Sequence, residues 1–326
     1  MRAEVYNQRG SSYLHSRPGA QAASAMRSLT GGIMSITTGD FRQRITVQTL
    51  ADKKHKHEPI VSLTAYDYAT ARIADEAGVD FILVGDSLAQ VVLGYDSTLP
   101  VTVEEMLHHT RAVRRAVKHA LLVVDMPFGS YHTGTRKALE NAARFVKEGG
   151  AEAVKIEGGT SRVPLVRRII DAEIPVVAHI GLTPQSVHRM GGYKVQGKTT
   201  AAIDQLLRDA VALDEAGVAA MVLEGIPREV AVRITAEVST PTIGIGAGPD
   251  CDGQILVFHD LVGLTFNPAA KFVRRYCNAG ELITSAIQSY GNDVRSRAFP
   301  ADEESYHLPR ELQHSAEAAK PAVSRK

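Results

Sequence analysis

Between residues 59 and 258 the chain alternates short apolar runs with longer segments in which apolar residues recur every three or four positions. The first pattern is typical of strands and the second of amphipathic helices. Strands are predicted at 59–66, 81–84, 120–124, 153–157, 175–178, 220–223, 241–245 and 255–258. Helices are predicted at 68–77, 103–118, 136–147, 163–172, 201–216 and 229–238. Because the strands are apolar throughout, both of their faces are expected to be covered, as in parallel sheets.

The junctions between helices and strands resemble one another, which indicates a repeated βα unit. They read EAGVD at 76–80, EGGAE at 148–152 and EAGVA at 215–219. About eight such units close a TIM (β/α)8 barrel. An open doubly wound sheet is the alternative, but it needs a glycine-rich phosphate-binding turn after its first strand. Gly244, Gly246 and Gly248 lack that spacing and come late in the chain, so the barrel is the predicted fold.

The two ends of the chain depart from this pattern. Residues 1–41 combine Arg with Ser, Gly and Ala and have no apolar periodicity, so we expect a disordered extension. Translation from an upstream start accounts for such a segment, and so does an organelle transit peptide at 1–33. Residues 309–326 are expected to be a disordered tail. The predicted catalytic barrel therefore occupies residues 42–308.

Composition and charge exclude several classes of protein. The 326 residues are 44% hydrophobic and 22% charged, which is typical of a soluble globular protein. A net charge of +1 offers no field for nucleic acid or an anionic membrane, and no apolar run approaches the length of a membrane span. Cys251 and Cys277 have neither disulfide-framework nor zinc-site spacing. We therefore expect a cytoplasmic location, or a mitochondrial one if residues 1–33 are a transit peptide.

The strand at 153–157 carries two charged residues where a buried strand should be apolar. Residues two apart in a strand share a face, so Lys155 and Glu157 are expected to point one way and Val154 and Ile156 the other. Buried charges are normally paired or bind something. A structural Lys–Glu pair is one explanation, and a ligand-binding pair is the other.

Acids recur at the ends of the other predicted strands, which favours the second explanation. In a barrel all strands end on the face that holds the active site, so these residues should meet there. The set comprises Asp86, Asp125, Glu157 and Glu224, with Lys155 and His179 beside them. Four carboxylates at one end of the barrel repel one another, and a bound divalent cation would relieve this repulsion. Because all of the ligands would be oxygens, Mg2+ is expected before Ca2+ or Mn2+. Separate salt bridges or helix caps at the barrel rim are the alternative.

Such a site suits a 2-oxo acid, which chelates Mg2+ through its carboxylate and keto oxygens. The ion then stabilises an enolate formed at C3, and a carboxylate that does not bind the metal can remove the C3 proton. Lys155 is suited either to a Schiff base with a carbonyl or to neutralising a substrate carboxylate. The carboxylates favour the second role, because a Schiff-base aldolase needs no metal. His179 either binds a substrate oxygen or is structural.

Several segments resemble those of the ketopantoate hydroxymethyltransferase family. They are TAYD at 64–67, VGDS at 84–87, DSTLPVT at 96–102, VKIEGG at 154–159, HIGLTPQS at 179–186, GGYKVQG at 191–197 and IGIGAG at 243–248. The resemblance runs from about residue 42 to residue 308 and keeps these motifs in order. The terminal extensions have no counterpart in the family.

The resemblance implies a barrel of the phosphoenolpyruvate/pyruvate superfamily type. It implies transfer of a hydroxymethyl group from 5,10-methylenetetrahydrofolate to 3-methyl-2-oxobutanoate, giving 2-dehydropantoate, with Mg2+ and a homo-oligomer, commonly a decamer. By motif, Asp86, Asp125 and Glu157 resemble the metal ligands, and Glu224 resembles the proton acceptor. The expected substrate-binding residues are Asp86, Ser87, Asp125, Lys155 and His179.

Two other functions compete with this one. Another metal-dependent 2-oxo acid lyase or mutase of the same superfamily would use the same acids, because the metal chemistry does not choose the electrophile. A non-catalytic barrel is also compatible with the fold alone. The intact acids at Asp86, Asp125, Glu157 and Glu224 argue against the latter.

Overall fold

The computed structural model describes residues 42–266, 268–310 and 312. The predicted extension at 1–41 and most of the predicted tail at 309–326 lie outside the described residues. Within the described part of the chain, no helix is both long and apolar enough to cross a membrane.

A closed barrel of eight parallel strands forms the centre of the fold. The strands are β1 (Ile60–Thr64), β2 (Phe81–Val84), β3 (Leu121–Asp125), β4 (Ala153–Glu157), β5 (Val176–Gly181), β6 (Ala220–Glu224), β7 (Thr242–Ile245) and β8 (Gly253–Leu256). Each strand pairs with the next in the chain, and β8 pairs with β1. The predicted TIM barrel is therefore confirmed.

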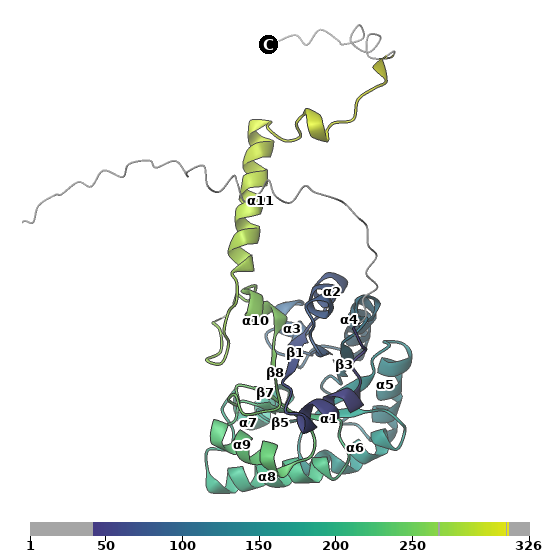
Figure 1. Ribbon diagram of the computed structural model, residues 1–326, viewed down its shortest axis with the longest axis vertical. Helices are drawn as coiled ribbons and strands as arrows, with labels where there is room; N and C mark the ends of the chain where they lie inside the picture. Colours follow the sequence, from purple (N-terminus) through teal and green to yellow (C-terminus); the bar gives the residue numbers. More distant parts are fainter. Residues whose placement is uncertain (1–41, 267, 311, 313–326) are drawn as a thin grey trace, which may run out of the picture. The chain divides into compact units, whose positions relative to one another are not determined.

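The described residues also form helices, most of which surround the strands (Figure 1). They are α1 (Val47–His55), α2 (Tyr68–Glu76), α3 (Leu88–Val91), α4 (Val103–Ala116), α5 (Thr135–Lys147), α6 (Val163–Ile170), α7 (Val187–Met190), α8 (Thr200–Asp214), α9 (Arg228–Glu237), α10 (Phe258–Val262) and α11 (Ala279–Ser296). The start of α4 shows why the boundaries follow from the sequence. Thr102 and Glu105 form a reciprocal capping box there, which satisfies two backbone N–H groups that a helix end leaves without partners.

Two details differ from the sequence prediction. The last strand covers Gly253–Leu256 rather than 255–258, because Phe258 already begins α10 and its N–H donates to Thr64 Oγ1 at 2.9 Å. Helix α1 was not predicted, since its nine residues bury one side chain fully, that of Leu50. That leucine belongs to the apolar cluster inside the barrel, so α1 covers the interior at the amino-terminal ends of the strands.

The apolar side chains of each strand alternate between two hydrophobic cores, one inside the barrel and one between the strands and the helices. Phe81, Leu83, Leu121 and Val123 belong to the cluster inside the barrel. Their neighbours Ile82, Val84, Leu122 and Val124 belong to the larger cluster that includes the surrounding helices. Residues two apart in a strand share a face. A residue at the carboxyl end of a strand therefore points into the barrel if the residue two positions before it does.

Candidate active site

The inward-facing sides of several strands end in the charged residues that were predicted from the sequence. Asp125 follows Val123 by two positions in β3, and Glu224 follows Val222 by two in β6, so both point into the barrel. Lys155 and Glu157 continue the face of Ala153 in the same way, while Val154 and Ile156 join the outer core. The strand pairing places Glu157 beside His179 and Asp125 beside Lys155.

One cavity of about 180 Å3 collects all of the predicted site residues. It is lined by Asp86, Ser87, Asp125, Lys155, Glu157, His179 and Glu224, among others. Asp86, Asp125, Lys155, Glu157 and His179 are each at most 4% exposed. The Glu224 side chain is more accessible, at 16%. The charges therefore sit at the base of a pocket from which water is largely excluded, where electrostatic interactions are strong.

Asp86, Asp125 and Lys155 are in direct contact. The backbone N–H of Asp86 donates to Asp125 Oδ2 at 2.9 Å, and Lys155 Nζ lies 2.9 Å from Asp125 Oδ1 and 4.0 Å from Glu157 Oε1. Burial raises the pKa of Asp86 well above its ordinary value, and repulsion from Asp125 and Glu157 adds to this. Burial alone would lower the pKa of Lys155, but the three carboxylates outweigh it and raise that pKa above its usual range. Lys155 is therefore a permanent cation.

His179 links Lys155 to Glu224. Its Nδ1 lies 3.0 Å from Lys155 Nζ and 3.4 Å from Glu157 Oε1, and its Nε2 lies 3.2 Å from Glu224 Oε2. Burial and Lys155 lower the pKa of His179, whereas Glu157 and Glu224 raise it, to about 9. A charged ring conflicts with the Lys155 contact, because two cations would then meet at 3.0 Å. We therefore assign a neutral ring with its proton on Nε2, directed at Glu224.

Three further residues in the site were not predicted from the sequence. Tyr66 is fully buried, and its hydroxyl lies 2.8 Å from Ser87 Oγ. Tyr131 and Gln185 are 2% and 5% exposed and are hydrogen-bonded to each other. Gln185 also donates from Nε2 to Asp86 Oδ2 at 2.8 Å. Uncharged residues in loops leave no periodic signal, and Gln185 was visible only as part of the HIGLTPQS segment.

The chemistry of these side chains fits a hard divalent cation. Five carboxylates line the cavity, because Asp260 of α10 joins the four predicted acids, and Lys155 is the one ammonium group among its lining residues. Asp125 Oδ1 and Glu157 Oε1 are buried and receive no hydrogen bond. In the described residues, however, no three His, Cys, Asp or Glu side chains already converge on one point as metal ligands. Lys155 lies among the acids instead, and it partly balances their charge.

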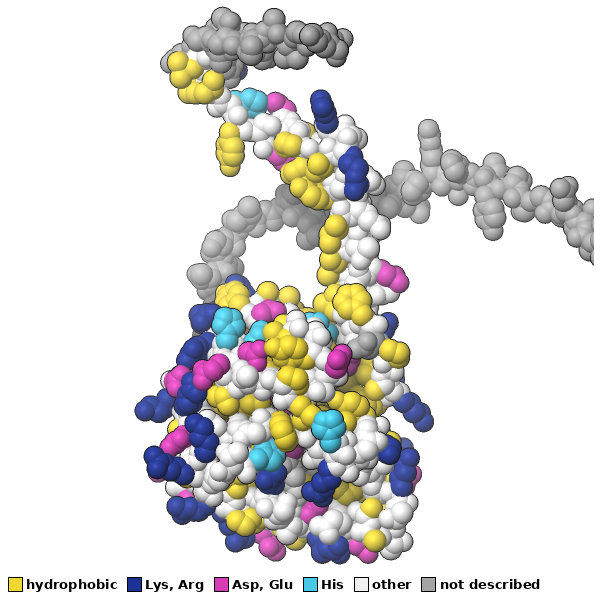
Figure 2. Space-filling view, turned by 180° about the vertical axis from the view of Figure 1, so that it is seen from behind, with side chains coloured by type: hydrophobic (Ala, Val, Ile, Leu, Met, Phe, Trp, Pro, Cys, Tyr) yellow, Lys and Arg dark blue, Asp and Glu magenta, His cyan; other side chains and the backbone are white. Residues whose placement is uncertain are grey.

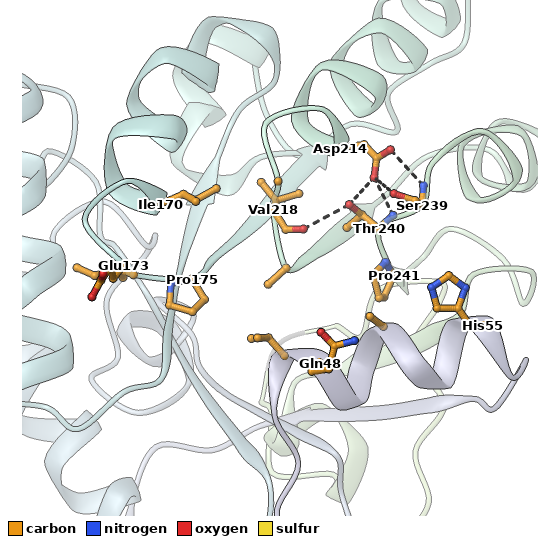
Figure 3. Close-up of a pocket in the computed structure, with 15 residues that line it drawn as sticks. Gln48, His55, Ile170, Glu173, Pro175, Asp214, Val218, Ser239, Thr240 and Pro241 are labelled. Atoms are coloured by element: carbon orange, nitrogen blue, oxygen red, sulfur yellow. Dashed lines mark hydrogen bonds between the residues drawn. The ribbon is translucent and has the colours of Figure 1, made fainter.

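A larger hollow at the opposite end of the barrel differs in character (Figure 3). It measures about 510 Å3 and is lined by α1 together with residues that precede β5, β6 and β7. It has two carboxylates, Glu173 and Asp214, and Asp214 is already satisfied, because it accepts hydrogen bonds from the backbone and hydroxyl groups of Ser239 and Thr240. Active sites of this fold lie at the carboxyl ends of the strands. We therefore place the chemistry in the smaller, charged cavity.

Solved structures with the same fold define the class of protein. The chain superposes with a TM-score of 0.51 on 2,3-dimethylmalate lyase, a PEP mutase/isocitrate lyase superfamily member, at 17% identity over 83% of this chain and 94% of that one. It superposes with a TM-score of 0.52 on phosphonopyruvate hydrolase in complex with oxalate and Mg2+, at 12% identity over 84% and 96% of the two chains. The chain thus shares its barrel fold with these two enzymes.

Sequence relatives identify the family within this class. Residues 44–302 match the family model described as ketopantoate hydroxymethyltransferase. A 3-methyl-2-oxobutanoate hydroxymethyltransferase of Koribacter versatilis is 70% identical over 284 residues, covering 87% of this chain and 96% of the relative. One from Geobacter sulfurreducens is 57% identical over 261 residues, covering 80% and 98%. The chain belongs to the ketopantoate hydroxymethyltransferase family and is an enzyme, as the resemblance in its motifs predicted.

The substitution Asp86→Asn should stabilise the metal-free protein near neutral pH. Because its pKa is raised on folding, Asp86 binds a proton more tightly in the folded protein than in the unfolded chain, and stability is lost as pH rises towards that raised pKa. Removing the charge should increase the melting temperature at about pH 8, by about 2–4 °C for each kcal/mol of repulsion relieved. The gain should shrink on acidification, since the wild-type carboxyl then takes up its proton.

Thermal unfolding in the presence of a chelator, from about pH 5 to about pH 8, measures this effect. Asp96→Asn is the matched control, because Asp96 is exposed and its substitution should leave the melting temperature unchanged. A lower melting temperature for Asp86→Asn than for the wild type at the alkaline end would contradict the proposed repulsion.

Proposed function

We propose that this enzyme transfers a hydroxymethyl group from 5,10-methylenetetrahydrofolate to 3-methyl-2-oxobutanoate, producing 2-dehydropantoate. Family membership supports the reaction, and the cavity supports its first step. The single observation that carries the proposal is that Glu224 stands across the cavity from three more deeply buried carboxylates, with its Oε2 3.2 Å from Nε2 of His179. One acid is thereby set apart from the others. A lyase or mutase shares the fold, but no observation on this chain favours it over the transferase.

We propose that Asp86, Asp125 and Glu157 hold Mg2+. Their oxygen donors match the preference of this ion, and the raised pKa of Asp86, caused by burial and by Asp125 and Glu157, is the electrostatic signature of acids that a cation would relieve. When bound, Mg2+ would supply a Lewis acid that withdraws negative charge from the oxo acid. Glu224 is kept out of this set, because it lies on β6 and is the most exposed of the four carboxylates.

Lys155 is proposed to bind the carboxylate of the oxo acid as a fixed positive charge. A Schiff-base lysine must lose its proton to act as a nucleophile, whereas the carboxylates around Lys155 keep its ammonium charged. Ser87 lines the same cavity, and Tyr66 holds its hydroxyl in place at 2.8 Å, so Ser87 is positioned as a hydrogen-bonding partner for substrate oxygens. This arrangement orients the substrate for proton removal at C3.

Glu224 is proposed to remove the C3 proton. Its Oε2 lies 3.2 Å from Nε2 of His179, and its carboxylate lines the cavity in which the substrate would bind. The electron pair left at C3 moves into the adjacent carbonyl, and the resulting enolate attacks the methylene carbon through C3. The bonds from that carbon to the two folate nitrogens break, water supplies the hydroxyl oxygen, and tetrahydrofolate leaves with the protons. The folate co-substrate would approach from the cavity mouth, where the aromatic side chains of Tyr193 and Phe272 are 51% and 38% exposed.

The direct test of the function is a coupled assay with the purified full chain. Incubation with 3-methyl-2-oxobutanoate, 5,10-methylenetetrahydrofolate and Mg2+ should yield 2-dehydropantoate, and a chelator should abolish the product. Formation of a cleavage product of the oxo acid without folate would favour a lyase instead. Formation of neither product would overturn the proposed function.

Glu224→Gln should abolish turnover while substrate binding remains. General base catalysis typically contributes on the order of 10²–10⁴ in rate, and the amide cannot accept the proton. The variant should also stop exchange of the C3 proton of 3-methyl-2-oxobutanoate with deuterated water, followed by proton NMR in the presence of Mg2+ and without folate. Glu229→Gln, which changes an exposed acid at the start of α9, should exchange like the wild type. Exchange at the wild-type rate by Glu224→Gln would assign the base to another group.

We also propose that the enzyme is a cytoplasmic homo-oligomer, a decamer by analogy with the family. Helix α11 supports self-association, since none of its residues is buried and hydrophobic side chains gather along it (Figure 2). Leu282, Ile283, Ile287, Tyr290 and Val294 are 43–69% exposed and fall on one side of the helix. An 18-residue helix with such a stripe is expected to pack against another copy of the chain. Cys251 and Cys277 are free thiols, which suits a reducing compartment.

Ile287→Glu should reduce the assembly to smaller species, because it places a charge in the middle of this stripe. Light scattering coupled to size-exclusion chromatography measures the mass directly. Gln288→Glu adds the same charge on the opposite side of α11 and should leave the mass unchanged. Identical masses for both variants and the wild type would exclude α11 as the interface.

A further inference from the structure

Gln185 is hydrogen-bonded to two of the carboxylates that line the cavity. It lies in a single 3-10 turn, Pro184–Ser186, directly after β5, and is 5% exposed. Its Nε2 donates to Asp86 Oδ2 at 2.8 Å and to the carbonyl of Met126 at 3.0 Å. Its backbone N–H donates to Glu157 Oε2 at 3.0 Å. One residue therefore contacts two of the three carboxylates assigned to the metal.

Tyr131 fixes the orientation of this amide. The Tyr131 hydroxyl lies 2.7 Å from Gln185 Oε1 and 3.3 Å from the backbone nitrogen of Glu157. Because a backbone N–H can only donate, the hydroxyl accepts from Glu157 and must direct its own proton at Gln185 Oε1. The amide nitrogen then has to face Asp86 and the Met126 carbonyl, which only accepts. No flipped amide satisfies the same contacts.

These hydrogen bonds occupy one particular oxygen of each carboxylate. Gln185 occupies Oδ2 of Asp86 and Oε2 of Glu157, and the backbone N–H of Asp86 occupies Oδ2 of Asp125. The opposite oxygens of Asp125 and Glu157, Oδ1 and Oε1, are buried and receive no hydrogen bond. Each acid is thus held through one oxygen by an N–H group. The other oxygens of Asp125 and Glu157 lie 2.9 Å and 4.0 Å from the ammonium of Lys155, so they face positive charge.

We infer that Gln185, oriented by Tyr131, is a positioning residue that turns one oxygen of Asp86 and one of Glu157 towards a divalent cation. The inference rests on the proposed metal set and deepens it. Gln185 does not bind the ion itself, because its only side-chain oxygen already accepts from Tyr131. Its contribution is to restrain the two carboxylates before the ion arrives, so that less conformational freedom is lost on binding.

Mn2+ affinity tests the inference without relying on turnover. The electron paramagnetic resonance signal of free Mn2+, titrated with the full chain, reports the dissociation constant. Gln185→Leu removes the amide and keeps the backbone N–H, and Mn2+ binding should weaken by about 10–100-fold, the range for loss of a partner behind a metal ligand. Thr242→Val is the control, because Thr242 is fully buried and loses comparable hydrogen bonds to Thr235 and Asp252 at the other end of the barrel.

The control separates positioning from stability. Both variants should melt at a lower temperature than the wild type, but only Gln185→Leu should lose Mn2+ affinity. If Gln185→Leu does not fold, Tyr131→Phe serves in its place, because it removes only the hydroxyl that orients the amide, and a loss of about threefold or more is expected. Affinity within twofold of the wild type for the folded variant would overturn the inference alone. Absence of Mn2+ binding by the wild type would overturn the metal assignment together with it.

Discussion

The site depends on an imbalance of charge in a buried space. Four carboxylates at the carboxyl ends of the strands surround the ammonium of Lys155, and only the Glu224 side chain has appreciable access to water. Repulsion inside a low-dielectric cavity is expensive, and one lysine cannot balance it. The barrel keeps this arrangement because its interior cluster and outer core fix the strand ends independently of the site. The proposed divalent cation would balance the negative charge that Lys155 leaves uncompensated.

Much of this could be predicted from the sequence, because the strands carry a strict two-residue period. That period decided that Lys155 and Glu157 share the inner face, and the barrel topology decided that Asp125 and Glu224 join them. What could not be predicted depends on loops. Tyr131 and Gln185 lie outside the strands, in loops whose path is set by hydrogen bonds between distant segments. Helix α1 was missed for a related reason, since a single buried leucine gives no helical periodicity.

The neutral imidazole of His179 explains how neighbouring acids come to differ. Glu157 lies at its Nδ1 side with Lys155, whereas Glu224 faces the Nε2 proton. This difference supports the proposal that Glu157 belongs to the metal set and that Glu224 takes a proton from carbon. The fold alone does not require this division, since the solved structures that share it include a lyase and a hydrolase. The position of Glu224, apart from the other three acids, is the feature of this barrel that supports the proposed proton abstraction.

The central claim is that the carboxylates at the ends of β2, β3 and β4 form the cation site. Anomalous diffraction from crystals of the enzyme grown with Mn2+ and 3-methyl-2-oxobutanoate tests it most directly. The account predicts a single strong peak bounded by Asp86, Asp125 and Glu157, with Glu224 outside the coordination shell. A peak in the hollow beneath α1, a peak that includes Glu224 as a ligand, or no peak in the charged cavity would contradict it.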